Sequence, residues 1–148
     1  MPIVVVDDHL LRDVLTGERP LDLGGLASAL ATTGLWLFRL SSSFAQPDVV
    51  GKLSTPVAAL PADQRERFVA QLGSLPSEIE VLSLRELAWP MAQLQQGHRA
   101  SGRPLSAAMV EALAVAHVLG AQIAVSARDV GPNLMAAAEH DGIVFHVL

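Results

Sequence analysis

The chain has 148 residues, no cysteine and a formal net charge of −5 at pH 7. This length suits one domain with a substantial hydrophobic core, so residues 1–148 are expected to form a single domain. The absence of cysteine excludes disulfides and thiolate metal sites, and it favours a reducing compartment such as the cytoplasm. The acidic balance argues against a strongly basic nucleic-acid platform, although a local basic patch would suffice to bind RNA.

Apolar residues make up 51% of the chain, whereas aromatic residues make up only 4%. The longest apolar runs, such as residues 112–119, are too short to cross a membrane, and this one contains His117. No basic segment followed by a long apolar stretch opens the chain, so no signal peptide is expected. The apolar content predicts a dense aliphatic core and an exposed apolar patch that favours a homodimer.

Apolar runs and turn residues predict alternating strands and helices along the first half of the chain. We expect a strand at 2–6, a helix at 9–15 and a helix at 23–31. Residues 35–40 fit a strand or a helix, and we favour a short extended piece that passes into a helix ending near Gln46. Turn residues make 47–61 the loosest segment.

The second half continues the alternation and decides the fold class. We expect helices at 62–72, 83–96, 105–119 and 132–140, and strands at 78–82, 121–126 and 143–147. Pro90 lies inside one of these helices and predicts a kink or a break there. The alternation predicts an α/β fold, a three-layer sandwich with a mostly parallel central sheet.

Carboxylates follow two of the most apolar predicted strands. Asp7 and Asp8 come directly after the first strand, and Asp129 comes soon after the strand at 121–126. Ligands of open α/β sheets bind outside the carboxyl ends of the strands, and converging carboxylates suit Mg²⁺. The alternative is structural, with Asp8 capping the next helix and Asp7 accepting hydrogen bonds in the turn.

Motifs near both ends of the chain have a family resemblance. The segment Val4-Val5-Val6-Asp7 precedes a leucine-containing helix, and Glu111 opens the alanine-rich segment 111–116. Gly120-Ala121 and the turn Ser126-Ala127-Arg128-Asp129 follow in order. This order resembles the PIN-like domain family, the fold of many VapC-like toxin–antitoxin ribonucleases, whose acids occupy the first strand end, a later helix and a strand-end turn.

The resemblance implies a metal-dependent ribonuclease over residues 1–148. Asp7, Glu111 and Asp129 would be catalytic, and together with Asp8 they would bind Mg²⁺ or Mn²⁺. The metal would activate water and stabilise charge on the attacked phosphate. Resemblance to the toxin group also implies an RNA substrate, a small antitoxin partner and a homodimer.

One departure from the family pattern supports a second hypothesis. Segment 36–41, where family members usually carry a glutamate, has Arg39 as its only charged residue. Because a cation cannot replace a metal ligand, the alternative is a catalytically inactive PIN-like binding or regulatory module. A third interpretation is an unrelated α/β protein that binds an anionic small molecule. Arg39 and Arg128 are candidate phosphate contacts in each case.

Two structural outcomes would separate the enzyme from the inactive module. Three carboxylates within reach of one cation would favour the enzyme, and a salt bridge from Arg39 into the acids would favour the module. Glu111 could instead lie on a solvated helix face, and Asp129 could serve only the turn before Gly131-Pro132. The five histidines of the chain show no metal-binding spacing.

Overall fold

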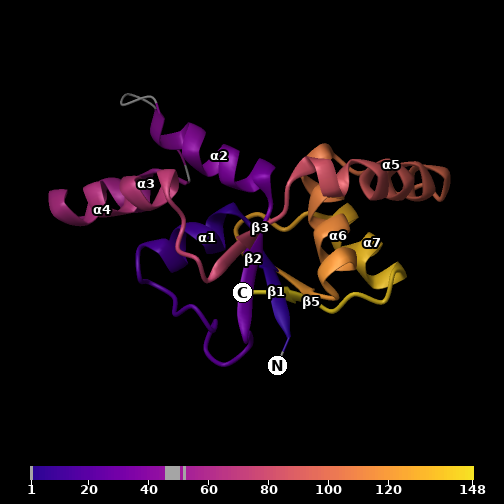
Figure 1. The fold of residues 1–148 in the computed structure, drawn as a ribbon, viewed down its shortest axis with the longest axis horizontal. Helices are drawn as coiled ribbons and strands as arrows, with labels where there is room; N and C mark the ends of the chain where they lie inside the picture. The colour runs from indigo at the N-terminus through magenta and orange to yellow at the C-terminus, as the bar shows by residue number, and fades with distance from the viewer. Residues whose placement is uncertain (1, 46–50, 52) are drawn as a thin grey trace.

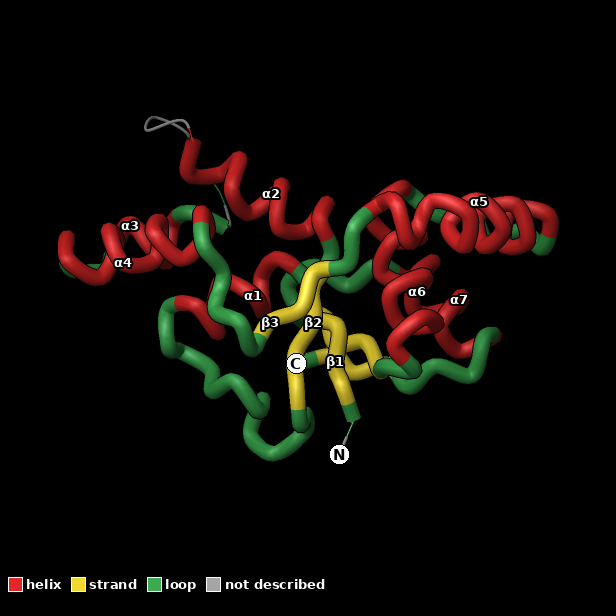
Figure 2. Tube along the Cα trace, in the orientation of Figure 1, coloured by secondary structure: helices red, strands yellow, loops and turns green. Residues whose placement is uncertain are grey.

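The computed structural model describes residues 2–45, 51 and 53–148. Within this part, five strands form an all-parallel sheet in the order β3-β2-β1-β4-β5, and helices cover both of its faces (Figures 1 and 2). The strands are β1 (Ile3–Val6), β2 (Ala29–Thr32), β3 (Ile79–Val81), β4 (Gln122–Val125) and β5 (Phe145–Val147). The predicted three-layer α/β fold is confirmed.

Two helical layers cover the sheet. One face packs against α5 (Leu84–Ala100), α6 (Ala107–Leu119) and α7 (Pro132–His140). The other face packs against α1 (Asp8–Leu15), α2 (Gly34–Ala45), α3 (Thr55–Ala58) and α4 (Ala62–Gly73). Figure 1 shows the two layers on opposite sides of the strands. No helix of the described residues has the length and hydropathy needed to cross a membrane.

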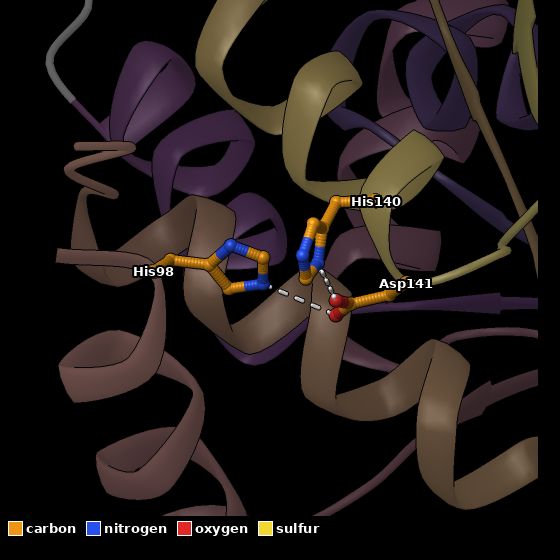
Figure 3. A group of neighbouring side chains, drawn as sticks. All are labelled: His98, His140 and Asp141. Atoms are coloured by element: carbon orange, nitrogen blue, oxygen red, sulfur yellow. Dashed lines mark hydrogen bonds and ion pairs between the residues drawn. The ribbon is translucent and has the colours of Figure 1, made fainter. Parts of the chain in front are cut away.

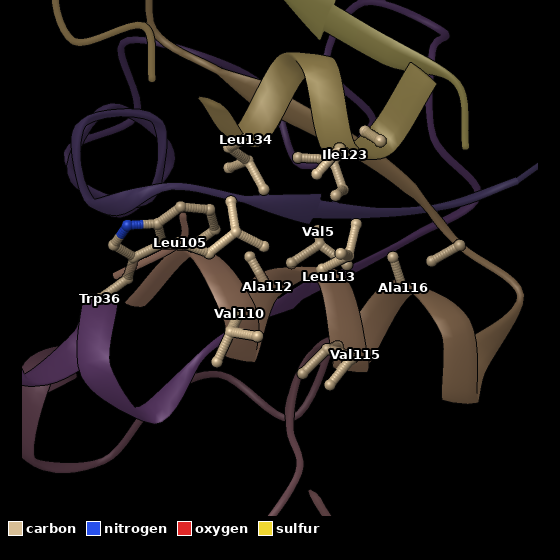
Figure 4. Packing of buried hydrophobic residues seen from close by; sticks show 14 of the residues in the cluster. Val5, Trp36, Leu105, Val110, Ala112, Leu113, Val115, Ala116, Ile123 and Leu134 are labelled. Carbon is tan, nitrogen blue, oxygen red and sulfur yellow. The ribbon is translucent and has the colours of Figure 1, made fainter. Parts of the chain in front are cut away.

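The central strand β1 is buried on both faces. Val4 and Val6 face the α1 layer and Val5 faces the α6 layer, and none of the three is exposed to solvent. Figure 4 shows Val5 beside Leu113 of α6, and Ile123 beside Leu134 of α7. Strands covered on both faces read as continuous apolar runs, which explains why β1 and β4 were predictable.

Helix α6 is the most deeply buried helix of its layer. The Ser106 hydroxyl caps it by accepting a hydrogen bond from the Met109 N–H at 3.3 Å, and Gly120 ends it with a left-handed φ of 61°. Every residue from Val110 to Ala116 is buried. The helix therefore carries Glu111 into the interior rather than onto a solvated face.

The prediction of a helix at 23–31 is wrong. Residues 21–26 form turns, and Ala29–Thr32 forms β2, which pairs in parallel with both β1 and β3. The turns use positive φ values of 73° at Gly24 and 92° at Gly25, which glycine adopts at little cost. Pairing on both edges outweighs the helix preference of leucine and alanine in this segment.

Other boundaries differ from expectation in smaller ways. Residues 35–40 contain no extended piece, because α2 already begins at Gly34; the expected end of this helix at Gln46 lies outside the described residues. The segment expected to be loose contains α3, and residues 47–50 and 52 of it also lie outside the described part. Helix α5 continues through Pro90 without a break and extends to Ala100.

The strand order places a topological switch point between β1 and β4. The chain adds β2 and β3 on one side of β1 and then crosses to the other side for β4 and β5. Crevices that bind ligands in such sheets open at the carboxyl ends of the two strands flanking this point. In this chain those ends lead into Asp7 and Ser126.

Candidate functional site at the carboxyl ends of β1 and β4

The Asp7 carboxylate links the carboxyl end of β1 to the carboxyl end of β4. Its Oδ1 accepts a hydrogen bond from the Leu10 N–H at 2.9 Å, and its Oδ2 accepts one from the Ser126 N–H at 3.0 Å. Asp7, and not Asp8 as expected, is thus the N-cap of α1. The same carboxylate fixes the turn that follows β4, so it holds the two edges of the switch point together.

Burial changes the acidity of this carboxyl group. Loss of solvent raises the pKa of Asp7 to about 6, an effect that the hydrogen bonds from Leu10 and Ser126 only partly offset. The negative charge of Asp8 raises the pKa further. Asp7 is therefore mostly ionised at neutral pH and becomes protonated in mildly acidic solution.

Asp8 and His9 lie buried in the first turn of α1. Asp8 Oδ1 accepts the His9 N–H at 2.9 Å and lies 3.0 Å from His9 Nδ1. Two polar atoms of this pair, Asp8 Oδ2 and His9 Nε2, have no hydrogen bond within the described part of the chain. Buried polar atoms without hydrogen bonds are costly, so His9 Nε2 is available to a ligand, whereas Asp8 Oδ2 has an ion-pair contact with Arg39.

The Arg39 guanidinium of α2 reaches across these acids. Arg39 Nε lies 3.4 Å from Asp8 Oδ2, and a terminal nitrogen lies 3.5 Å from Asp129 Oδ2. Asp8 is fully buried, whereas the Arg39 side chain is 49% exposed. The guanidinium therefore covers the acidic cluster from its solvent side and neutralises part of its charge.

Asp7, Asp8 and His9 could hold a metal ion. One ligand atom from each lies within 4.8 Å of the others, and among the described residues neither Glu111 nor Asp129 belongs to this group. Asp7 already uses both oxygens on backbone N–H groups. Because Arg39 occupies the approach to Asp8 Oδ2, a cation that binds there has to displace the guanidinium.

Glu111 serves the start of α2. Its Oε1 accepts the Leu35 N–H at 2.8 Å, and its Oε2 lies 3.4 Å from the position that a Cβ on Gly34 would take. A carboxylate at this point satisfies one of the open N–H groups of the helix and favours its dipole. The structure therefore gives Glu111 a helix-capping contact from 76 residues away in sequence.

This contact predicts different effects for two substitutions of Glu111. Glu111→Gln keeps an oxygen for the Leu35 N–H, so we expect a loss below about 1 kcal/mol in the free energy of unfolding. Glu111→Ala leaves the partly buried Leu35 N–H unpaired and creates a cavity, so we expect a loss of about 2–4 kcal/mol. Urea denaturation of both variants measures the difference, and equal losses would argue against the capping contact.

Two adjoining cavities open at this edge of the sheet. The larger, about 270 Å³, has lining residues that include His9, Arg39, Ser43, Arg128 and Asp129. The smaller, about 110 Å³, is lined by residues that include Asp7, Arg39 and Asp129. Arg39 and Asp129 lie on the boundary of both cavities, so the predicted site residues Asp7, Asp129, Arg39 and Arg128 gather around one crevice.

His9 and Ser126 also belong to this candidate site, although neither was among the predicted site residues and Ser126 appeared only as part of the strand-end turn. His9 looks like an ordinary first-turn residue, and the Ser126 contribution is a backbone N–H that no side-chain pattern reveals. No known protein family model matches the chain, and no curated protein matches it. The resemblance to PIN-like domains therefore stays a prediction based on the motifs alone.

Proposed function

We propose that the chain is a PIN-like binding module that does not cleave RNA, in which the Arg39 guanidinium takes the place of a divalent cation. One observation carries the proposal: Arg39 contacts both Asp8 and Asp129 within 3.5 Å. A guanidinium stabilises converging carboxylates as a cation does, but it can neither activate a water molecule nor exchange for substrate. In this proposal Asp8 and Asp129 neutralise the charge of Arg39 and hold its side chain in place, and they bind no metal ion.

The ligand in this proposal is single-stranded RNA held by its phosphates. Arg128 is exposed at the larger cavity, and no ion pair in the described part of the chain engages its side chain. His9 Nε2 and the hydroxyl of Ser43 are further polar groups around this cavity. One arginine without a carboxylate partner and several neutral polar groups suit contact with one phosphate of such a strand.

RNA binding and cleavage can be measured together on the full chain. We expect a fluorescently labelled single-stranded RNA to bind without being cut when Mn²⁺ is present. Arg128→Gln should weaken binding and reduce the slope of log affinity against log salt by about 1. Arg67→Gln is the matched control because Arg67 is a surface arginine of α4 paired with Asp63.

A metal-dependent ribonuclease is the second candidate. It is favoured by the spacing of Asp7, Asp8 and His9 and by the oxygen of Asp8 that lacks a hydrogen bond. Mn²⁺-dependent cleavage by the wild type that disappears in Asp8→Asn would replace the first proposal with this one. Absence of RNA binding would instead remove RNA as the ligand. The antitoxin partner and the homodimer stay predictions of the resemblance.

A further inference from the structure

Three histidines and an aspartate converge at a second place, on α5, α6 and α7. His98 Nε2 lies 3.1 Å from Asp141 Oδ2, and His117 Nε2 lies 2.9 Å from the same oxygen. His140 Nδ1 lies 3.1 Å from Asp141 Oδ1. Figure 3 shows the rings of His98 and His140 directed toward the Asp141 carboxylate. None of these residues belongs to the strand-end site.

The Asp141 carboxylate at the centre of this cluster is shared by all three histidines. Its Oδ2 lies 3.1 Å from His98 Nε2 and 2.9 Å from His117 Nε2, and its Oδ1 lies 3.1 Å from His140 Nδ1. The Asp141 side chain is 12% exposed, and that of His98 is 4% exposed. A shielded negative charge surrounded by imidazoles offers strong attraction to a cation.

The donor set is that of a borderline-soft transition metal. Imidazole nitrogens with one carboxylate oxygen are ligands that Zn²⁺ prefers in four-coordinate sites. In a tetrahedron with bonds of about 2.0–2.1 Å, neighbouring ligand atoms lie about 3.3 Å apart. The separations of 2.9–3.1 Å from Asp141 are a few tenths of an ångström shorter; those of His98 and His117 end on Oδ2, and that of His140 ends on Oδ1.

Two further features of the cluster favour a cation. Among the described residues, ligand atoms of His98, His140 and Asp141 all lie within 4.8 Å of one another, and His117 does not belong to this group. The three histidines also come from the last turns of α5, α6 and α7, where helix dipoles place partial negative charge. The C-terminal ends of three helices therefore place partial negative charge near one point. A bound cation would offset the repulsion between these charges.

Arg103 opposes the cation and sets the tautomer of His98. Arg103 Nε donates to His98 Nδ1 at 3.0 Å, so in the metal-free state the proton of a neutral His98 lies on Nε2. A metal at Nε2 requires this proton to move to Nδ1, which breaks the contact with Arg103. The affinity of the site is therefore reduced by one guanidinium that the metal has to displace.

We propose that His98 Nε2, His140 Nδ1 and the Asp141 carboxylate bind one Zn²⁺ ion, and that the exposed His117 of α6, whose Nε2 lies 2.9 Å from Asp141 Oδ2, turns in as the fourth ligand and joins the ends of α5, α6 and α7. A closed set of four protein ligands is typical of a structural zinc site. The ion would tie three helices of one layer together, and its binding would raise the melting temperature of the chain. This site is independent of the function proposed for the strand ends.

The test is a titration of the tag-free full chain with Zn²⁺ alone and with Co²⁺ alone. We expect one equivalent of Zn²⁺ to bind and Co²⁺ to show the visible absorption of a tetrahedral site. The double variant His117→Ala/His140→Ala should bind at least about tenfold more weakly. These side chains are 40% and 59% exposed, so the variant should fold. The single variant His140→Ala provides a milder change of the same site.

Two controls separate this site from others on the chain. His146→Asn removes a histidine that contacts Gln122 outside the cluster, and Asp8→Asn weakens the strand-end acids. Both should bind Zn²⁺ as the wild type does. Loss of binding in Asp8→Asn would overturn the proposal by moving the ion to the strand ends, and so would a wild type that binds no Zn²⁺.

Arg103→Met should change the affinity for Zn²⁺ in the opposite direction from the histidine variants. Methionine keeps an apolar stem but removes the charge and the donor to His98 Nδ1. We expect Zn²⁺ to bind severalfold more tightly to this variant, because neither a repelling charge nor a locked tautomer remains. Unchanged or weaker binding in Arg103→Met, or wild-type affinity in the His117/His140 double variant, would show that the cluster is only a hydrogen-bonded helix junction.

Discussion

Arg39→Glu should bind Mn²⁺ at the strand ends about 10- to 100-fold more tightly than the wild type. The substitution changes the local charge by two units beside Asp8 and Asp129, which now lie 3.4 and 3.5 Å from the guanidinium. Unit charges 4 Å apart interact by about 4 kcal/mol at an effective dielectric constant near 20. Because Arg39 is 49% exposed, we expect solvent to reduce the effect to about 1–3 kcal/mol.

Calorimetric titration of both proteins at equal pH and salt measures this change. Arg67→Glu alters the net charge of the chain by the same amount on the exposed surface of α4, so it controls for long-range attraction of the ion.

Arg39→Glu should melt at a lower temperature without metal, because three carboxylates then lie together, and Mn²⁺ should restore the loss. Equal affinity in a folded variant would show that Arg39 does not compete with a cation.

The stability of the wild type should fall as the pH rises from about 4 to about 7 through the ionisation of Asp7. The pKa of this carboxyl group is raised from 3.8 to about 6 in the folded chain, so the folded state holds the proton more tightly than the unfolded state. The stabilisation is fully present below 3.8 and is lost as the pH passes 6. A difference of this size corresponds to about 3 kcal/mol.

Urea denaturation at several pH values, with Asp7→Asn as the comparison, isolates this contribution. Asparagine does not titrate, so the difference in unfolding free energy between wild type and variant should shrink as the pH rises. The slope is the readout, because the Asp7→Asn variant also loses the acceptor for the Ser126 N–H and is less stable at every pH. Parallel curves from pH 4 to 7 would contradict the raised pKa of Asp7.

Ionisation of Asp141 has the opposite effect on stability from that of Asp7, and it occurs in another pH range. The lowered pKa of about 2 means that the contribution of Asp141 to stability is present above 3.8 and is lost as the pH falls toward 2. The two aspartates therefore limit stability from opposite sides, Asp7 near neutral pH and Asp141 in strong acid.

Much of the fold could be predicted from local sequence patterns. The unbroken apolar runs of β1 and β4 indicate strands buried on both faces, and Gly120 marks the end of α6. The position of Asp7 at the edge of the switch point was predictable because it follows β1 directly, and parallel strands bring their carboxyl ends to one edge. Arg39 stood out because it was the only charge in its segment.

Tertiary contacts decided the rest. Strand β2 has few strand-forming residues and exists because β1 and β3 pair with both of its edges. The partner of Glu111 lies 76 residues away, and packing of α6 against α2 rather than any local motif creates the contact. The distances from Arg39 to Asp8 and Asp129 likewise depend on how α2 docks over the strand ends.

The histidine cluster shows most clearly what local sequence patterns determine and what only tertiary packing decides. His98, His117 and His140 lie too far apart in sequence for any metal-binding motif, so the sequence determined only that each would fall near the end of a helix. Packing of α5, α6 and α7 on one face of the sheet then brought these ends around Asp141. Periodicity and capping are local and readable from the chain, whereas the meeting of helix ends depends on how whole faces pack.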